Sequence, residues 1–288
     1  MYNRLVMFHY IAANRVDIND RTSASSIPRT ELVRLLEHTN QLWTSDDNLA
    51  DSDMDIIQRK RSREMSYMLY LDKRYPNALF VCTKGTDERK DWFINLDFKE
   101  VNFKIGNDTL KVHGGFLDVL NDYYYPLIKS EIAKCRQYYR DTYNQEINMV
   151  IFHGHSLGGA ITSLLGTLFQ TDRNFDLPCF NVTFAQPPCF AKQGKELFIK
   201  HNVRQITVTD DKDPVTFATS PFKPKFHVGK RIIIRDGKVD EIVDPIVFYK
   251  YSIKHILAIV SHVKSYTVEK HARINYINSL LTQPKGLL

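Results

Sequence analysis

The chain has 288 residues, of which 43% are hydrophobic, and its 39 basic residues outnumber 33 acidic ones. This length suffices for one large core, and no run rich in Pro, Gly or Ser divides it, so we expect a single domain over residues 1–288. The positive excess is diffuse, which excludes a typical nucleic-acid-binding protein. No apolar run approaches the roughly 18 residues that span a bilayer.

The N-terminal residues 1–60 are predicted to form helical segments that pack on the domain. Breaks are expected at residues 23–28 and 45–53, where Ser, Pro, Asp and Asn gather. Residues 5–13 are apolar but interrupted by His9, which indicates an amphipathic helix rather than a signal peptide. We therefore expect a cytoplasmic protein that meets membranes only from their surface.

A basic run at residues 58–63 precedes the first predicted strands. It is interpreted as a solvated turn, and contact with anionic lipid headgroups is the alternative. Residues 65–71 and 78–82 then flank a turn at residues 72–77, which predicts a hairpin or a closely spaced strand pair.

The rest of the chain alternates between helical and strand patterns. A long helix is predicted over residues 115–143, adjusted near Pro126, and a shorter one over residues 192–201. Strands are predicted at residues 147–152, 181–185 and 203–209, and Asp236-Gly237 predicts a hairpin between residues 226–235 and 239–243. A last helix is expected to start near His262. This alternation indicates an α/β fold with a mostly parallel sheet and helices on both faces.

The four cysteines, Cys82, Cys135, Cys179 and Cys189, have no metal-ligand spacing, and we expect them to be buried thiols. The sequence has no glycine-rich phosphate loop and no Cys/His cluster, so neither a cofactor nor a metal is expected.

Residues 150–160 are the most informative stretch of the chain. An apolar strand leads into Gly154-His155-Ser156-Leu157-Gly158, and small and aliphatic residues suited to a helix, predicted over residues 157–169, follow. This is the pattern of a nucleophile elbow, in which a serine occupies a sharp strand-to-helix turn between close-packed glycines. The pattern makes Ser156 a candidate nucleophile and the Leu157 N–H an oxyanion donor.

In this architecture an acid and a base follow the serine in chain order. Three carboxylates, Asp210, Asp211 and Asp213, follow the strand predicted at residues 203–209, and their positions alone do not separate them. The downstream histidines are His227, His255, His262 and His271. His227 precedes an isoleucine-rich strand and is interpreted as structural, which leaves the last three open as the base.

Several separated motifs then occur in a characteristic order. They are Lys84-Gly85-Thr86 with Asp91-Trp92 and Asn95-Leu96, Val112-His113-Gly114-Gly115-Phe116, the elbow, Thr183-Phe184-Ala185-Gln186-Pro187, residues 210–215, residues 226–229, and His262-x-x-x-Tyr266. In order and spacing, from about residue 65 to 270, the chain resembles the class 3 lipases, the family of the fungal triacylglycerol lipases and related plant phospholipases. The resemblance implies an α/β-hydrolase fold.

Position by position, the resemblance implies Ser156 as nucleophile, Asp213 as acid and His262 as base. It implies Thr86 as the second oxyanion residue beside Leu157, and a lid over residues 87–96 whose apolar side chains are Trp92, Phe93 and Ile94. Three departures stand out. The family's Phe-Arg-Gly before the oxyanion residue is Thr83-Lys84-Gly85 here, its Gly-Ser/Gln-Pro-Arg is Ala185-Gln186-Pro187-Pro188, and the Asn three residues before the acid is Asp210.

The function implied is hydrolysis of acyl-lipid esters, as in triacylglycerol or diacylglycerol lipases, through an acyl-enzyme, with peripheral contact to a membrane or lipid-droplet surface. The alternatives within enzymes are a phospholipase A1-type enzyme and a hydrolase of short-chain or aryl esters. The alternative from another class is a lipid-binding pseudoenzyme that keeps the fold without turnover.

Overall fold

A computed structural model describes residues 29–42, 53–61, 65–84, 100–217, 225–235, 238–242 and 272–281. The predicted helix at residues 5–13, Thr86, the lid residues Trp92, Phe93 and Ile94, and His262 lie outside these ranges. Among the described residues, no helix is both long enough and apolar enough to cross a membrane.

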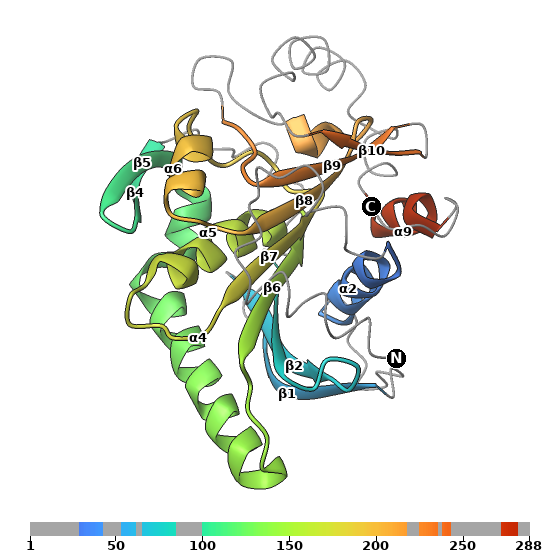
Figure 1. The fold of residues 1–288 in the computed structure, drawn as a ribbon. Coiled ribbons are helices and arrows are strands. Elements are labelled where there is room, and N and C mark those ends of the chain that lie inside the picture. The colour runs from blue at the N-terminus through green and yellow to red at the C-terminus, as the bar shows by residue number, and fades with distance from the viewer. Residues whose placement is uncertain are drawn as a thin grey trace.

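An eight-stranded sheet runs through the middle of the described structure in the order β1-β2-β3-β6-β7-β8-β9-β10 (Figure 1). The strands are β1 (Met54–Lys60), β2 (Ser66–Asp72), β3 (Ala78–Lys84), β6 (Met149–His155), β7 (Cys179–Phe184), β8 (Gln205–Asp210), β9 (Lys230–Arg235) and β10 (Lys238–Ile242). The pairs from β3 to β9 are parallel, and the outer pairs are antiparallel. The predicted mostly parallel sheet is confirmed.

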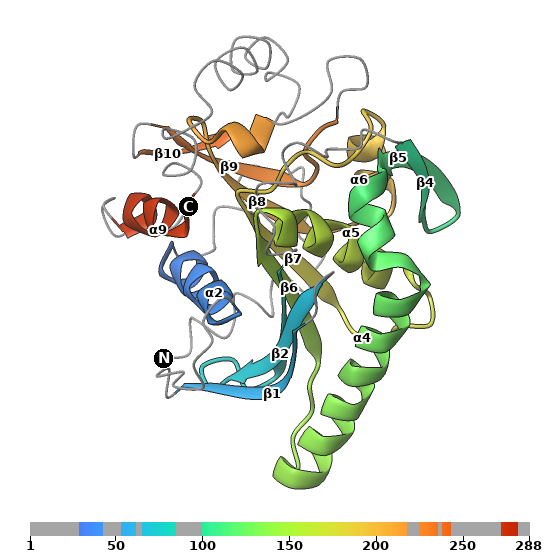
Figure 2. The ribbon, with the colours of Figure 1, turned by 180° about the vertical axis from the view of Figure 1, so that it is seen from behind.

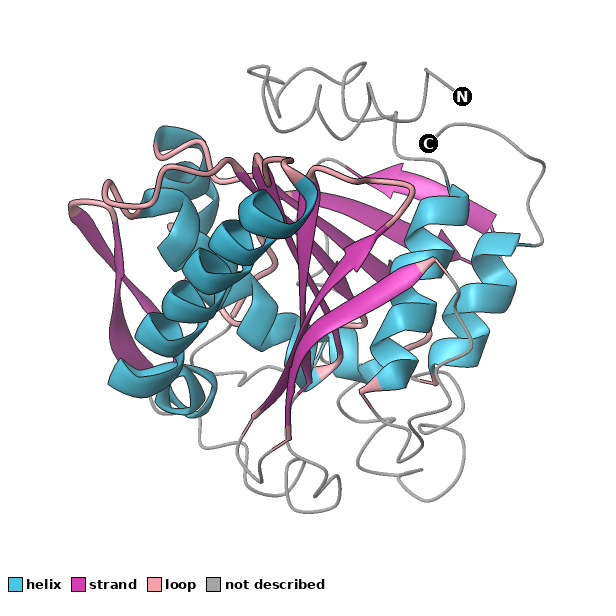
Figure 3. Cartoon of the chain, turned by 90° about the horizontal axis from the view of Figure 1, so that it is seen from below, coloured by secondary structure: helices cyan, strands magenta, loops and turns pink. Residues whose placement is uncertain are grey.

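Helices cover both faces of this sheet (Figures 2 and 3). The helices α4 (Gly114–Tyr143), α5 (Leu157–Thr171) and α6 (Gly194–Lys200) lie on one side, while α2 (Arg29–Gln41) and α9 (Arg273–Leu281) lie side by side on the other. A short 3-10 helix, η1 (Pro214–Phe217), follows β8. Two apolar cores result, and the buried strands β2 and β3 contribute alternate residues to each.

The predicted buried thiols are confirmed, since all four cysteines are buried and free. Burial raises the pKa of Cys135 to about 11 and also raises the pKa values of Cys82, Cys179 and Cys189. These thiols are therefore unreactive core residues.

The expectation of helical segments over residues 1–60 is right for α2 and wrong for the end of that range. Residues 54–60 form β1, which pairs antiparallel with β2 and carries the first part of the basic run on a sheet edge. For residues 58–60, the prediction of a solvated turn is therefore wrong. The segment forms a strand by pairing with β2, while its residues Met54, Ile56 and Ile57 pack against the two cores, and charge on an edge strand discourages pairing with other chains.

A second hairpin, β4 (Glu100–Ile105) and β5 (Asp108–His113), was not predicted. Its two-residue turn is Gly106-Asn107, and Gly106 has φ +58°, a conformation that glycine adopts readily. Asp108 fastens the hairpin to the end of α6 through His201 Nε2 at 2.6 Å and Lys200 Nζ at 2.7 Å.

Candidate active site

Ser156 occupies the turn between β6 and α5 in a strained conformation. Its φ is +60° and its ψ is −129°, a region that residues other than glycine rarely adopt. The Ser156 N–H donates to the Phe184 carbonyl at 2.9 Å, and the Ala160 N–H donates back to the Ser156 carbonyl at 3.2 Å. The turn thus presents Ser156 at the carboxyl edge of the sheet, where α/β proteins place their ligand sites.

The glycines around Ser156 allow strand and helix to approach closely. A Cβ added to Gly154 would lie 2.6 Å from the Gly158 carbonyl oxygen, and one added to Gly158 would lie 2.3 Å from the Thr83 carbonyl oxygen. Real Cβ atoms essentially never make such contacts, so both positions require glycine. Leu157, whose N–H is the predicted oxyanion donor, is buried at the start of α5.

The loop after β8 separates the three candidate carboxylates. Asp213 is fully buried, accepts from the Val215 N–H at 2.9 Å through Oδ1, and accepts from the Tyr276 hydroxyl at 2.7 Å through Oδ2. Asp210 accepts from the Lys212 N–H at 2.8 Å. Asp211 is partly exposed and accepts from Arg235 Nε at 3.2 Å. Of the three, Asp213 is the most completely buried, and it accepts a hydrogen bond from a side chain on the distant helix α9.

Tyr276 joins the C-terminal helix α9 to this loop. Its hydroxyl donates to Asp213 and accepts from the Asp210 N–H at 3.0 Å, and its ring meets the His155 ring edge to face at a centroid distance of 6.1 Å. Burial, and then the negative charge of Asp213, raise the pKa of Tyr276 well above its ordinary value. The phenol therefore stays protonated and donates to the carboxylate at any physiological pH.

His227 contacts the same loop through a hydrogen bond to Thr216, in the structural role predicted for it. Its Nε2–H donates to the Thr216 carbonyl at 2.8 Å, and the Thr216 hydroxyl donates to the Asp213 carbonyl at 2.8 Å. Burial and the nearby Arg231 guanidinium lower the pKa of His227 well below its ordinary value. The imidazole is therefore a neutral donor.

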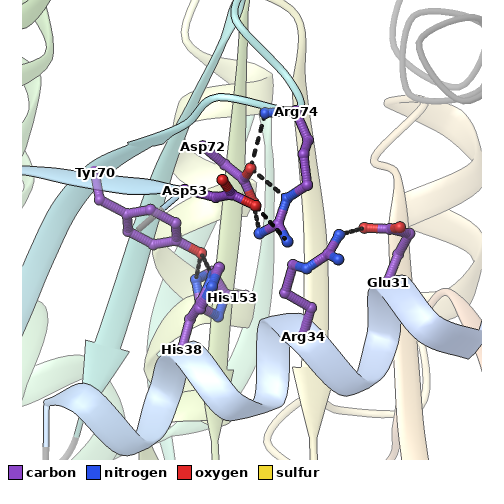
Figure 4. Close-up of polar contacts among 8 residues, drawn as sticks. All are labelled: Glu31, Arg34, His38, Asp53, Tyr70, Asp72, Arg74 and His153. Atoms are coloured by element: carbon purple, nitrogen blue, oxygen red, sulfur yellow. Dashed lines mark hydrogen bonds and ion pairs between the residues drawn. The ribbon is translucent and has the colours of Figure 1, made fainter. Parts of the chain in front are cut away.

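A buried polar chain ties α2 to the strand that carries the serine (Figure 4). The Tyr70 hydroxyl lies 2.9 Å from His38 Nδ1 and 2.8 Å from His153 Nε2, and His153 stands three residues before Ser156 on β6. Burial, and then the charge of His38, lower the pKa of His153 well below its ordinary value. Nearby, Arg74 pairs with Asp72 at 2.5 Å, while Arg34 and Glu31 pair at 2.8 Å on α2.

The structure thus brings together the elbow, the carboxylate loop and a tyrosine that the sequence patterns did not single out. Tyr276 has no local signal, because its contact with Asp213 joins residues 63 positions apart. Among the described residues no group of three His, Cys, Asp or Glu side chains is arranged to hold a metal ion.

A mostly parallel sheet with a strained serine at a strand-to-helix turn defines an α/β-hydrolase fold. The family model described as lipase (class 3) matches residues 80–223, which is half of the chain. The chain therefore belongs to the class 3 lipase family, and it is a carboxylic ester hydrolase of the lipase type. No curated protein sequence matches the chain significantly.

Solved structures of fungal lipases share the fold. A deletion mutant of the lipase propeptide complex of Rhizomucor miehei is 17% identical, with a TM-score of 0.63 over 85% of this chain and 80% of that one. Lipase II of Rhizopus niveus is 16% identical, with a TM-score of 0.59 over 78% and 93% of the two chains. A triacylglycerol lipase of Penicillium expansum is 17% identical, with a TM-score of 0.58 over 75% and 84%.

Proposed function

We propose that the chain hydrolyses acyl-lipid esters through an acyl-enzyme on Ser156, with Asp213 as the triad acid. The observation that carries the proposal is the strained Ser156 at the elbow, on the sheet edge that also carries the buried Asp213 carboxylate. Strain of this kind is kept at functional sites because the surrounding structure holds it there. A serine in a plain connecting turn would relax.

In the proposed reaction a histidine takes the Ser156 proton as Oγ attacks the ester carbonyl. The Leu157 and Thr86 N–H groups stabilise the negative charge that develops on the carbonyl oxygen. The histidine then gives its proton to the departing alcohol, and a water molecule, activated by the same histidine, releases the fatty acid. Asp213 holds the histidine in the required tautomer and stabilises its cation.

Asp213 suits this role better than its neighbours. Its carboxylate is shielded from water and already oriented by two donors, whereas Asp211 forms a surface pair and Asp210 closes its own turn. A buried, oriented carboxylate interacts strongly with an imidazolium because the local dielectric constant is low.

The base is proposed to be one of two histidines. The resemblance assigns it to His262, four residues before Tyr266. The tyrosine that contacts Asp213, however, is Tyr276 on α9, and the histidine that precedes Tyr276 at a comparable spacing is His271, five residues earlier. This spacing makes His271 an alternative to His262, and replacement of each histidine separately decides between them.

A phospholipase A1-type activity is the second candidate, and the position of the basic run favours it. Sheet register aligns Lys60 with Tyr67, Tyr67 with Thr83 and Thr83 with Gly154. Three strand spacings separate Lys60 from Gly154, about 15 Å, and the exposed Arg61 follows Lys60 at the end of β1 that lies on the catalytic edge. The positive charges of Lys60 and Arg61 would attract anionic phospholipid headgroups to this edge.

Two measurements test these proposals. Fluorophosphonate labelling of the purified chain should modify Ser156, and the label should be lost in Ser156→Ala and strongly reduced in Asp213→Asn, with Asp211→Asn as matched control. Absence of any label on the folded wild type would favour the alternative, a lipid-binding pseudoenzyme. Comparing hydrolysis of anionic phospholipid vesicles, neutral triacylglycerol emulsions and a soluble short-chain ester then separates the three substrate classes. Trp92, Phe93 and Ile94 are the proposed lid residues that would contact the lipid.

A further inference from the structure

The end of β3 is fastened to the beginning of α5 by a buried pair of threonines. The Thr83 hydroxyl donates to the Gly158 carbonyl at 2.8 Å, and it lies 2.7 Å from the Thr162 hydroxyl. Both side chains are fully shielded from water. The contact therefore links a residue near the end of β3 to positions two and six residues after Ser156.

The two hydroxyls and the Gly158 carbonyl form one buried hydrogen-bonded group. A threonine hydroxyl can both donate and accept, and that of Thr83 contacts the Gly158 carbonyl and the Thr162 hydroxyl. Removing the Thr83 hydroxyl therefore takes a hydrogen-bond partner from buried polar atoms of α5.

The backbones of β3 and α5 are in close contact at the same place. Gly158 lies so close to β3 that an added Cβ would meet both the Thr83 carbonyl oxygen at 2.3 Å and the Lys84 Cα at 3.0 Å. A Cβ on Gly154 would meet the Thr162 hydroxyl at 2.6 Å. The two elbow glycines therefore make room for the threonine pair.

The two elements joined here carry or directly precede the proposed oxyanion donors. The Leu157 N–H stands at the first residue of α5, and Thr86 follows Lys84, the last residue of β3, by two positions in the chain. Class 3 lipases usually have phenylalanine where this chain has Thr83, and a phenyl ring can make neither hydrogen bond. The threonine pair is thus a feature of this chain.

We propose that Thr83 is a positioning residue that sets the spacing between the two oxyanion donors by binding β3 to the first turn of α5. This inference rests on the proposed function, because it presumes that Ser156 generates an oxyanion. It predicts an effect on turnover rather than on substrate binding, because the oxyanion exists only in the transition state and the intermediates near it.

The test compares Thr83→Val, Thr83→Ser and Thr183→Val in hydrolysis of a soluble p-nitrophenyl ester. Loss of one oxyanion donor lowers kcat by about 100- to 1,000-fold, and displacing a donor lowers kcat by less. Thr83→Val should therefore lower kcat by about 10- to 100-fold and change KM by less than about threefold. Thr83→Ser keeps the hydroxyl and should recover kcat to within about threefold.

Thr183→Val is the matched control. Thr183 is equally buried and donates to another threonine, Thr207, at 3.0 Å, but this pair joins β7 to β8 rather than β3 to α5. Its kcat should stay within about threefold of wild type. Wild-type kcat in a folded Thr83→Val, or an equal loss in Thr183→Val, would overturn the positioning role.

Two further measurements keep the inference testable. If Thr83→Val does not fold, Thr162→Val removes the hydroxyl that contacts Thr83 from the helix side and should lower kcat by about 3- to 10-fold. No change in kcat would count against the inference. Affinity for an alkyl boronic acid, which mimics the tetrahedral intermediate, should fall in parallel with kcat. If the wild-type chain neither hydrolyses the ester nor is labelled at Ser156, the proposed function is overturned, and the positioning role with it. If the wild type is active and Thr83→Val has the same kcat, only the positioning role is overturned.

Discussion

Replacing Tyr276 with phenylalanine removes one hydroxyl at the point where the C-terminal helix meets the proposed acid. That hydroxyl donates to Asp213 Oδ2 at 2.7 Å and accepts from the Asp210 N–H at 3.0 Å. Phenylalanine keeps the ring and its edge-to-face contact with His155. The substitution therefore tests the two hydrogen bonds with little change in packing.

The size of the effect follows from these two bonds. A hydrogen bond to a charged group contributes about 1.5–3 kcal/mol, and a buried N–H left without an acceptor costs about 1–3 kcal/mol. Since partial relaxation offsets some of this, we expect Tyr276→Phe to lower the free energy of unfolding by about 2–4 kcal/mol. The less restrained carboxylate should also lower kcat by about 10- to 100-fold, because Asp213 would orient the base less well.

Urea unfolding and ester hydrolysis measure the two effects separately. Tyr70→Phe is the matched control, since Tyr70 is also fully buried and its hydroxyl bonds two groups, His38 and His153, on the same face of the sheet. This control should lose stability and keep kcat within about threefold. The reasoning is refuted if Tyr276→Phe retains both wild-type stability and wild-type kcat, or if Tyr70→Phe loses kcat to the same extent.

Three further predictions follow from the site. Replacing the catalytic base with alanine should lower kcat by at least about 10⁴-fold, so parallel assays of His262→Ala and His271→Ala should show one inactive and one active enzyme; full activity in both would leave His255. Gly158→Ala should unfold at markedly lower urea concentration than Gly115→Ala, because the added Cβ meets backbone at 2.3 Å in the first case and a histidine ring at 3.4 Å in the second. His153 and His227 have folded-state pKa values below the ordinary 6.5, so the unfolded chain binds more protons, and stability should fall as pH drops below about 6.5. Each histidine contributes up to about 1.4 kcal/mol per pH unit; urea midpoints that stay constant between pH 7 and 5 would contradict the neutral, buried imidazoles.

The parts of the fold that local patterns encode could be predicted from the sequence. The hairpin of β2 and β3, the long helix α4 and the turn at Ser156 each occupy one continuous stretch, and their apolar spacing or glycine content reports the local conformation. β1 could not be found in this way, because its residues are mostly polar and it becomes a strand by pairing with β2. The hairpin of β4 and β5 does carry a local signal, a two-residue Gly-Asn turn between alternating apolar residues.

The candidate site divides in the same manner. Ser156 and Leu157 could be predicted because the elbow is local, and the resemblance supplied Asp213 from a loop with three acids. Tyr276 and the pairing of Thr83 with Thr162 depend on contacts between residues 63 and 79 positions apart. No periodicity or spacing reports such contacts, because they arise only when the sheet brings separate strand ends to one edge.

Helices α2 and α9, on the face of the sheet opposite α5, contact different parts of the surroundings of the site. α9 carries Tyr276 to the Asp213 carboxylate, and α2, which packs against α9, reaches β6 through His38 and Tyr70 at His153, three residues before Ser156. The acid loop is therefore restrained by this helical layer through α9, whereas the contact of α2 with β6 ends at His153, and its loss should lower stability rather than turnover. Because α9 would lose its packing partner, disrupting α2 should loosen Asp213 through Tyr276. Helix α2 thus does more than shield an apolar surface of the sheet from water.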